Sequence, residues 1–596
     1  MDKLRNNLNN PTDDQHEEGK FNKIYKRKER VGEIMADRRL LIAGTIVVLI
    51  IVVGAYVLWP RPAAPPPEEV PKYRVLRSTW AFPTYIDPAV GTDRSSSCAQ
   101  INLYDPLIKL GPGGVIIPWI ATNWTYSEDG LTWNFTIRQG VLFHDGTELT
   151  AEDVAFSINR MLRMGTGRAY VLEPYVYPNV TVVGDNIVQF HLKVPFGPLV
   201  SALNGWYILN KDLVMQHIES GEYGDWGDYG KEWLTTHDAG SGPYKVKSFV
   251  LEEKLVMEKF EDYWAGFVDK APDIVEMIGT TEPITVRTML ANGELEYSDC
   301  WQSLENLLAI KEIPNITISA RADTTGGWQL MINTKKPPCD DVHFRRAMAY
   351  CLNYTKMVTD IFPGTVQMVG PVNTAMLGHN PDVLQFHQNF DKAREELALS
   401  KYADNYTEYE VELHWCAEVP DEEKLAMQFM TDCAVVNIDI KVVKTPWTTM
   451  VQETGSLETS PHMVYISAGG AYPEAGSMLM SRYHSSNAAS WMQNEWLLNE
   501  TLDAMMEDAV STLNFNERLE KYKAIQVEIV NLCPTIWLYQ GIYWHAYPNY
   551  VTPPWVVNGT YVKTAILGDV YIYTPQSGGD FECRLYRVDR EIEYGG

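Results

Sequence analysis

Residues 133–154 read WNFTIRQGVLFHDGTELTAEDV, a stretch that joins three local structural signals. From Leu131 to Arg138, large apolar residues alternate with Thr and Asn, which predicts a strand with one buried face. Asp145-Gly146 is a typical turn pair. Thr150-Ala151-Glu152-Asp153 has the pattern of a capping box, and the apolar residues after it recur at helical spacing. The stretch therefore predicts a strand, a tight turn and a capped helix in succession.

The same mixture of strand and helix signals continues along the chain. Ile187 to Leu192 predicts another strand, and amphipathic helices are predicted at Phe390 to Leu399 and at Asn499 to Val510. This alternation indicates an α/β protein. His144 and Asp145 could also form a catalytic pair, but because Asp-Gly forms turns we interpret them as part of the scaffold.

Residues 133–154 resemble the signature of the family 5 solute-binding proteins, which include oligopeptide, dipeptide, nickel and some oligosaccharide binders. Shorter matches follow in the family's order, and together they extend from about Lys72 to the C-terminus: Ile86-Asp87-Pro88, Tyr104-Asp105-Pro106-Leu107, Gly240-Ser241-Gly242-Pro243-Tyr244, Tyr263-Trp264, Gly293-Glu294-Leu295-Glu296, Asn333 through Pro338, and Phe390-Asp391. The resemblance implies a type II periplasmic-binding-protein-like α/β fold, with two main lobes plus an extra lobe around a ligand cleft.

The resemblance also implies how the chain is divided among the lobes. Lobe I is expected at about 72–106, 196–328 and 546–596. Lobe II is expected at about 107–195, and lobe III at about 329–545.

A membrane anchor is predicted before the solute-binding ectodomain, which is residues 72–596. Residues 40–59 carry no charge and as a helix would span about 30 Å, the thickness of a bilayer core. Lys and Arg residues precede them, so residues 1–39 are predicted to be cytoplasmic and the C-terminal part extracellular. A cleaved signal peptide is the alternative. Residues 60–71 contain six prolines and predict an extended linker.

Eight cysteines and eight N-x-T sequons follow the predicted anchor, in agreement with an outside location. An even number of cysteines outside the cell permits disulfides, whose connectivity stays open. Glycosylated sequons together with a transmembrane tether suggest an archaeal cell-surface glycoprotein. The sequon asparagines are Asn123, Asn134, Asn179, Asn315, Asn353, Asn405, Asn499 and Asn558.

Several classes of function are disfavoured. The formal charge of −27 argues against a nucleic-acid partner, whose phosphates the protein would repel. No zinc-protease, serine-hydrolase, Walker or Rossmann motif is found, so no catalytic residue and no enzyme activity is predicted. The twelve His are scattered without metal-ligand spacing, and neither a metal nor another cofactor is predicted.

The expected ligand site departs from the family pattern. In peptide-binding members, an acid in a segment like A-D-Y-x-x-P holds the peptide ammonium. The matching segment here is 468–474, in which Ala471 stands where the acid would be. Glu474 is a substitute, or the ligand is neutral and stacks on aromatic rings. By the resemblance, the aromatic candidates are Trp80, Tyr104, Trp206, Trp301, Trp328, Tyr472 and Trp491.

The resemblance implies a binding component of an ABC importer. Its partners would be a small solute, either an oligopeptide or an oligosaccharide, and the permease and ATPase subunits, with membrane contact through one helix. An envelope protein that reuses the solute-binding fold is the alternative.

Overall fold

A computed structural model of the chain describes residues 35, 37–55, 71–111, 115–322, 326–417, 419–555, 560–563, 569–572 and 581–594. The chain divides into two compact units, residues 1–71 and residues 72–596.

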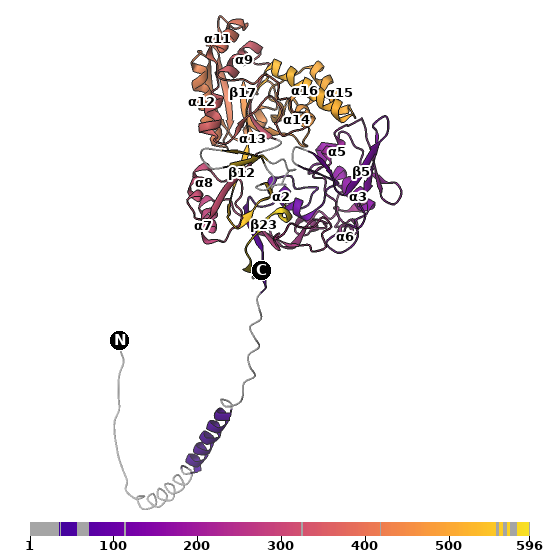
Figure 1. The fold of residues 1–596 in the computed structure, drawn as a ribbon, viewed down its shortest axis with the longest axis vertical. Helices are drawn as coiled ribbons and strands as arrows, with labels where there is room; N and C mark the ends of the chain where they lie inside the picture. Colours follow the sequence, from indigo (N-terminus) through magenta and orange to yellow (C-terminus); the bar gives the residue numbers. More distant parts are fainter. Residues whose placement is uncertain are drawn as a thin grey trace, which may run out of the picture. The chain divides into compact units, whose positions relative to one another are not determined.

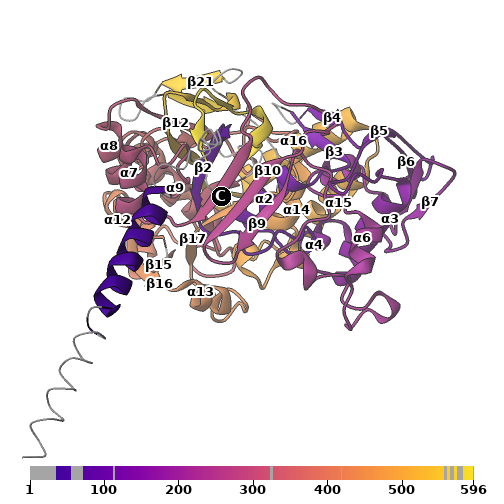
Figure 2. The same cartoon turned by 90° about the horizontal axis from the view of Figure 1, so that it is seen from below.

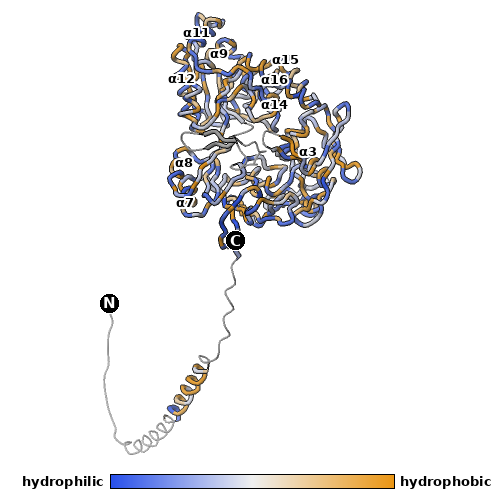
Figure 3. The backbone as a smooth tube through the Cα atoms, in the orientation of Figure 1, coloured by the Kyte–Doolittle hydropathy of each residue, from blue (hydrophilic) through white to orange (hydrophobic). Residues whose placement is uncertain are grey.

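Among its described residues, the first unit contains one apolar helix, Asp37–Ala55, whose 19 residues are long and apolar enough to cross a membrane (Figure 3). A helix of this length spans about 28 Å. It begins three residues before the predicted anchor, and residues 56–59 of that anchor lie outside the described residues. A signal sequence would have the same length and composition, so the helix alone does not distinguish the two predictions.

The stretch at 133–154 has the predicted structure. β6 (Thr132–Ile137) alternates between buried and half-buried residues, and α3 (Ala151–Met164) follows the turn. Thr150 closes the capping box, because its backbone N–H donates to Asp153 Oδ2 at 2.8 Å. His144 contacts Asp238 Oδ1 through Nδ1 at 2.5 Å and Gly242 O through Nε2 at 2.9 Å, which supports its interpretation as scaffold.

The second unit contains two four-stranded sheets whose strands come from distant parts of the sequence. One has the order β2 (Val75–Trp80), β11 (Ile274–Gly279), β10 (Lys254–Lys259), β9 (Tyr244–Val250), with β2 and β11 parallel. Its strands β2, β9 and β10 are labelled in Figure 2. The other has the order β19 (Ile542–Pro548), β12 (Ile316–Ala322), β22 (Asp569–Ile572), β21 (Thr560–Lys563). Helices α7 (Pro283–Asn292) and α8 (Leu304–Lys311) share a small apolar core with β12 and β19.

A third four-stranded sheet is antiparallel throughout. Its order is β5 (Ala121–Tyr126), β6, β8 (Ile187–His191), β7 (Thr181–Val182). The amphipathic helix α3 contacts β7 and β8 and covers this sheet. Further helices before residue 217 are α2 (Arg94–Leu103), α4 (Ala169–Leu172), α5 (Leu199–Ala202) and α6 (Lys211–Gln216) in the part of the chain that the structure describes.

Residues 326–540, here called the six-stranded region, contain the largest sheet. Its order is β14 (Val366–Gln367), β18 (Thr535–Gln540), β13 (Gly326–Ile332), β17 (Met463–Gly469), β15 (Glu410–Cys416), β16 (Asp439–Thr445). The helices of this region include α9 (Val342–Cys351), α11 (Phe390–Leu399), α12 (Asp421–Ala434), α13 (Trp447–Glu453), α14 (Ala475–Tyr483), α15 (Glu500–Ser511) and α16 (Phe515–Leu532) (Figure 1), and also the short α10 (Tyr354–Lys356). The predictions of helices at 390–399 and 499–510 are confirmed, with Asn499 as the N-cap of α15.

The chain enters and leaves the six-stranded region through neighbouring strands. β12 pairs with β19 in one sheet, with Ala322 opposite Ile542. β13 pairs with β18 in the other sheet, with Trp328 opposite Tyr539. The backbone therefore passes between the two sheets twice, after Ala322 and after Gln540, and the strand ends that flank the two crossings are neighbours. We call these strand ends, at Ala322, Gly326 and residues 540–542, the hinge, because backbone motions between rigid parts concentrate at such connections.

Candidate solute-binding site

One edge of the six-stranded sheet combines the features of a ligand site. β15, β16 and β17 are parallel, so their carboxyl ends share an edge. Gly326, the first residue of β13, pairs with Gly469, the last residue of β17, so the hinge lies at this same edge. In open α/β sheets, ligands bind beyond the carboxyl ends of the strands. We call this edge the hinge edge.

Trp328 lies at the hinge edge in an aromatic stack. Its ring is stacked on Tyr539, with the centroids 5.8 Å apart and the planes 18° apart. Phe362 also stacks on Tyr539, at 4.4 Å. Trp328 and Phe362 are half-buried, whereas Tyr539 is buried. The stack therefore presents aromatic surface at the rim of the sheet and is supported from the core.

The loop after β17 holds the position of the missing acid. The backbone N–H groups of Ala471 and Tyr472 donate to Ser477 Oγ, at 2.6 and 3.2 Å. These bonds fix the loop, but the Ala471 methyl group offers no charge to a ligand ammonium. Tyr472 is buried, and its ring meets Phe196 edge-on at 6.0 Å.

Glu474 is buried and already has an ionic partner. Arg518 Nε donates to Oε2 at 2.9 Å, and Arg518 Nη2 donates to Oε1 at 3.1 Å. Ser201 Oγ donates to Oε1 at 2.7 Å. The role of Glu474 as the partner of a ligand ammonium stays a prediction, but this carboxylate is neutralised without a ligand.

Trp301 is the most exposed of the predicted aromatic contacts, at 45%. Its ring meets the buried ring of Trp80 edge-on at 6.0 Å. Its backbone N–H donates to Asp299 Oδ1 at 2.9 Å, while Gln302 Nε2 donates to Asp299 Oδ2 at 2.7 Å. Burial raises the pKa of Asp299 to about 6. Asp299 therefore holds the backbone that carries an exposed ring.

The remaining aromatic candidates are less accessible. Trp80, Tyr104 and Trp206 have almost no exposed surface, and Tyr104 packs against Tyr207 at 6.1 Å. Trp491 is half-buried and meets Trp447 edge-on at 5.2 Å. Trp301, Trp328 and Trp491 thus have ring surface available in this conformation, and their contact with a solute stays a prediction.

Comparison with known proteins identifies the family. The family described as "Bacterial extracellular solute-binding proteins, family 5 Middle" has a sequence model that matches residues 115–490. The chain belongs to this family. Its fold is accordingly the predicted α/β, type II periplasmic-binding-protein-like one.

Two curated relatives of this family 5 protein are described as peptide binders. The probable D,D-dipeptide-binding periplasmic protein of Escherichia coli (strain K12) is 25% identical over 487 residues, which cover 80% of this chain and 90% of the relative. The di/tripeptide-binding protein 2 of Pseudomonas aeruginosa (strain UCBPP-PA14) is 27% identical over 406 residues, covering 63% and 73%. The relatives are solute-binding proteins, which confirms that no enzyme activity is to be assigned.

Solved structures show the same fold. A periplasmic binding protein of Helicobacter pylori, solved with the peptide STSA, has a TM-score of 0.65 at 21% identity and covers 87% of this chain and 99% of its own. An ABC transporter substrate-binding protein of Listeria monocytogenes has a TM-score of 0.73 at 18% identity and covers 87% and 100%.

Glu422 is a buried acidic residue that the sequence analysis of this family 5 protein does not single out. It lies at the start of α12, is 1% exposed, and its Oε2 accepts a hydrogen bond from the Cys416 backbone N–H at 2.7 Å. In the part of the chain that the structure describes, no Lys, Arg or His forms an ion pair with it, and burial raises its pKa to about 8. Asp421 and Glu423 flank it and are exposed, so the sequence offers no signal that singles out the middle acid.

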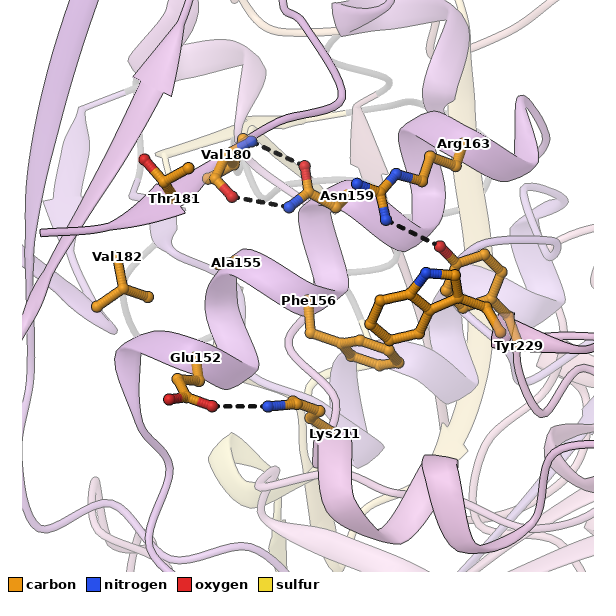
Figure 4. Close-up of a pocket in the computed structure, with 11 residues that line it drawn as sticks. Glu152, Ala155, Phe156, Asn159, Arg163, Val180, Thr181, Val182, Lys211 and Tyr229 are labelled. Carbon is orange, nitrogen blue, oxygen red and sulfur yellow. Dashed lines mark hydrogen bonds and ion pairs between the residues drawn. The ribbon is translucent and has the colours of Figure 1, made fainter. Parts of the chain in front are cut away.

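Two pockets of this family 5 protein lie away from the hinge edge. One of about 290 Å³ is formed by α3, β7, α6 and the loop at Trp226 (Figure 4). The other, of about 630 Å³, lies beside Asn315 and Arg590. None of the predicted solute contacts lines either pocket. In the first pocket, polar side chains are satisfied locally: Glu152 binds Lys211, Asn159 binds the Val180 backbone, and Arg163 donates to Tyr229.

The sequon asparagines differ in accessibility. Asn558 lies outside the described residues. Asn123, Asn179 and Asn315 are exposed, whereas Asn134, Asn353, Asn405 and Asn499 are half-buried. Glycosylation stays a prediction, and the disulfide connectivity stays open.

Proposed function

We propose that this family 5 protein is the membrane-anchored, extracellular solute-binding component of an ABC importer. It captures a peptide or a similar oligomeric solute and delivers it to the permease, whose ATPase subunits supply the energy. Membership of the family carries this proposal, and the peptide-binding descriptions of its relatives support the solute class.

The hinge supports a capture mechanism. A solute at the hinge edge would contact the six-stranded region on one side and the sheets of the remaining chain on the other. Closure around the solute then needs no chemistry, only ligand contacts that are better in one conformation than in the other. We propose that the six-stranded region corresponds to lobe III and that lobes I and II comprise the rest of residues 72–596.

The helix Asp37–Ala55 supports the anchor. In this proposal residues 1–39 are cytoplasmic, the helix crosses the membrane, and the proline-rich linker joins it to the solute-binding unit. A retained anchor keeps the binding protein near its permease.

An oligosaccharide is the second candidate solute. Ala471 removes the usual partner of a peptide ammonium, and the half-buried Trp328 and exposed Trp301 are suited to stacking on sugar rings. We place peptides first because both relatives above are described as peptide binders.

The test is a thermal-shift screen of the purified full chain against peptide and oligosaccharide libraries. A ligand that binds only the native state raises the unfolding temperature by mass action. Stabilisation by members of one library identifies the solute class. Absence of stabilisation by any compound contradicts the proposed function and favours an envelope role.

A further inference from the structure

A second contact joins the six-stranded region to the rest of the unit. The backbone joins the two parts at the hinge, and non-covalent contacts join them at a second place. Figure 1 shows α5 facing α14 and α15, and the contacts are made by residues 196–201 on one side and residues 472–474 and 510–518 on the other. We call this contact zone the latch.

The carboxylate of Glu474 lies at the centre of the latch, and its ion pair is formed entirely within the six-stranded region. Arg518 binds Glu474 through two nitrogens, and both residues belong to the six-stranded region. Arg518 also donates from Nη1 to Thr512 O at 2.9 Å, which fixes the guanidinium. Ser201 then completes the site from the opposite side, at 2.7 Å from Oε1. All three of these side chains are almost fully buried: Ser201, Glu474 and Arg518.

The backbone contributes a second bond to the latch. Gly197 N–H donates to Val510 O at 2.8 Å. A Cβ atom at Gly197 would lie 2.1 Å from Thr512 O, which is backbone and cannot turn aside. Glycine is therefore needed here because the two chain segments approach so closely.

An aromatic contact completes the latch. Phe196 meets Tyr472 edge-on at 6.0 Å across the zone, and on its own side it stacks on Tyr175 at 3.9 Å. The latch thus contains a side-chain bond, a backbone bond and a ring pair, each with one partner on either side. All of them would have to separate if the two parts rotated apart about the hinge.

We propose that the latch holds the conformation in which the two parts are closed on each other, and that Glu474 is a positioning residue that acts through Ser201. This inference rests on the proposed solute-binding function for its purpose. Because only the closed fraction retains solute, the apparent affinity falls in proportion to that fraction. The latch would therefore tune affinity through the size of the closed fraction.

Ser201→Ala is the cleanest variant. It removes the bond across the latch and leaves the ion pair of Glu474 with Arg518 intact, so no buried charge loses its partner. Glu474→Gln is less suitable because it leaves Arg518 without its carboxylate. Ser157→Ala is a matched control, since the Ser157 hydroxyl is also buried and its partners, Asp153 O and the Leu209 N–H, do not involve the six-stranded region.

Hydrogen exchange of the solute-free full chain in detergent micelles tests the inference. In Ser201→Ala we expect amides in peptides covering 196–203 and 508–513 to exchange about tenfold faster, since a hydrogen bond to a charged group is lost. Peptides from β13 and β17 should be unchanged. Ser157→Ala should accelerate exchange only around α3 and Leu209, the elements that its hydroxyl joins. Unchanged exchange in the latch peptides, or acceleration on one side only, overturns the proposal.

Gly197→Ala provides an independent check. Its Cβ keeps the segments apart while Ser201 and Glu474 remain, so both sides should again exchange faster; unchanged exchange overturns the proposal. Neither experiment uses a solute. If the exchange experiments contradict the latch, the proposed solute-binding function is unaffected. If no solute binds, that function is contradicted, but the exchange results at the latch still hold.

Discussion

Trp328 stacks on Tyr539 across the paired strands β13 and β18, with ring centroids 5.8 Å apart, at the point where the chain enters and leaves the six-stranded region. A ring in this place is rigid because its neighbour is buried, and it lies beside the hinge. We therefore expect it to be the main stacking surface for a solute.

Replacement of Trp328 by Ala should weaken solute binding by roughly 2 kcal/mol or more, the size typical of a central aromatic anchor. Affinity should change little with salt, because stacking involves no exposed ion pair. Isothermal titration with the solute found in the screen measures both. Trp233→Ala is the control, a half-buried Trp that stacks on His217. Equal losses in the two variants would contradict the stacking role.

Asp299→Asn should weaken binding through Trp301. The carboxylate accepts hydrogen bonds from the Trp301 backbone N–H, from Gln302 and from Thr79. The side-chain NH₂ group that this substitution introduces would face one of these donors and could not accept its hydrogen bond. The loop that carries the exposed Trp301 ring should therefore become more mobile. We expect an affinity loss comparable to that of Trp301→Ala, and no additional loss when the two changes are combined. Additive losses would show that Asp299 acts separately.

The contribution of Glu422 to stability should fall as the pH rises from about 4.5 to about 8. Burial raises the pKa of Glu422 to about 8, so the folded state holds a proton that the unfolded state has released. The contribution of Glu422 is therefore most favourable below about pH 4.5 and is lost as the pH approaches 8. Glu422→Gln should remove this part of the pH dependence and raise the melting temperature at pH 8.

Glu423→Gln is the matched control for this measurement, because Glu423 is the exposed neighbour of Glu422. Thermal unfolding of the wild type and both variants from pH 5 to pH 8 compares them. His462, whose pKa burial lowers to about 4, changes stability in the opposite direction below about pH 6.5, so the interval from 6.5 to 8 is the decisive one. Identical pH profiles in all three proteins would show that Glu422 is solvated.

The mature protein should retain its N-terminal helix. Intact-mass measurement of the membrane fraction should find a chain that includes residues 37–55. A mature N-terminus near Pro60 would instead identify the helix as a cleaved signal and remove the proposed anchor.

Local features of the fold could be predicted because their causes are local. The capping box at Thr150 and the helices at 390–399 and 499–510 depend on residues close together in sequence. The family resemblance supplied the architecture.

The arrangement of the site could not be predicted in the same way. Ser201 and Glu474 are 273 residues apart, and Glu474 and Arg518 are 44 apart, so no spacing rule relates them. Trp301 is exposed whereas Trp206 is buried, although the family resemblance predicts both as solute contacts. Tertiary packing alone decides which of these rings is available to a solute.

The most direct test of the central claim is native mass spectrometry of the purified full chain, followed by rebinding of whatever solute is released. The proposed function predicts a stoichiometric small solute, a peptide or an oligosaccharide, that raises the melting temperature when added back and binds less tightly to the Trp328→Ala variant. A chain that carries no solute, and that no peptide or oligosaccharide stabilises, would contradict a role in solute capture.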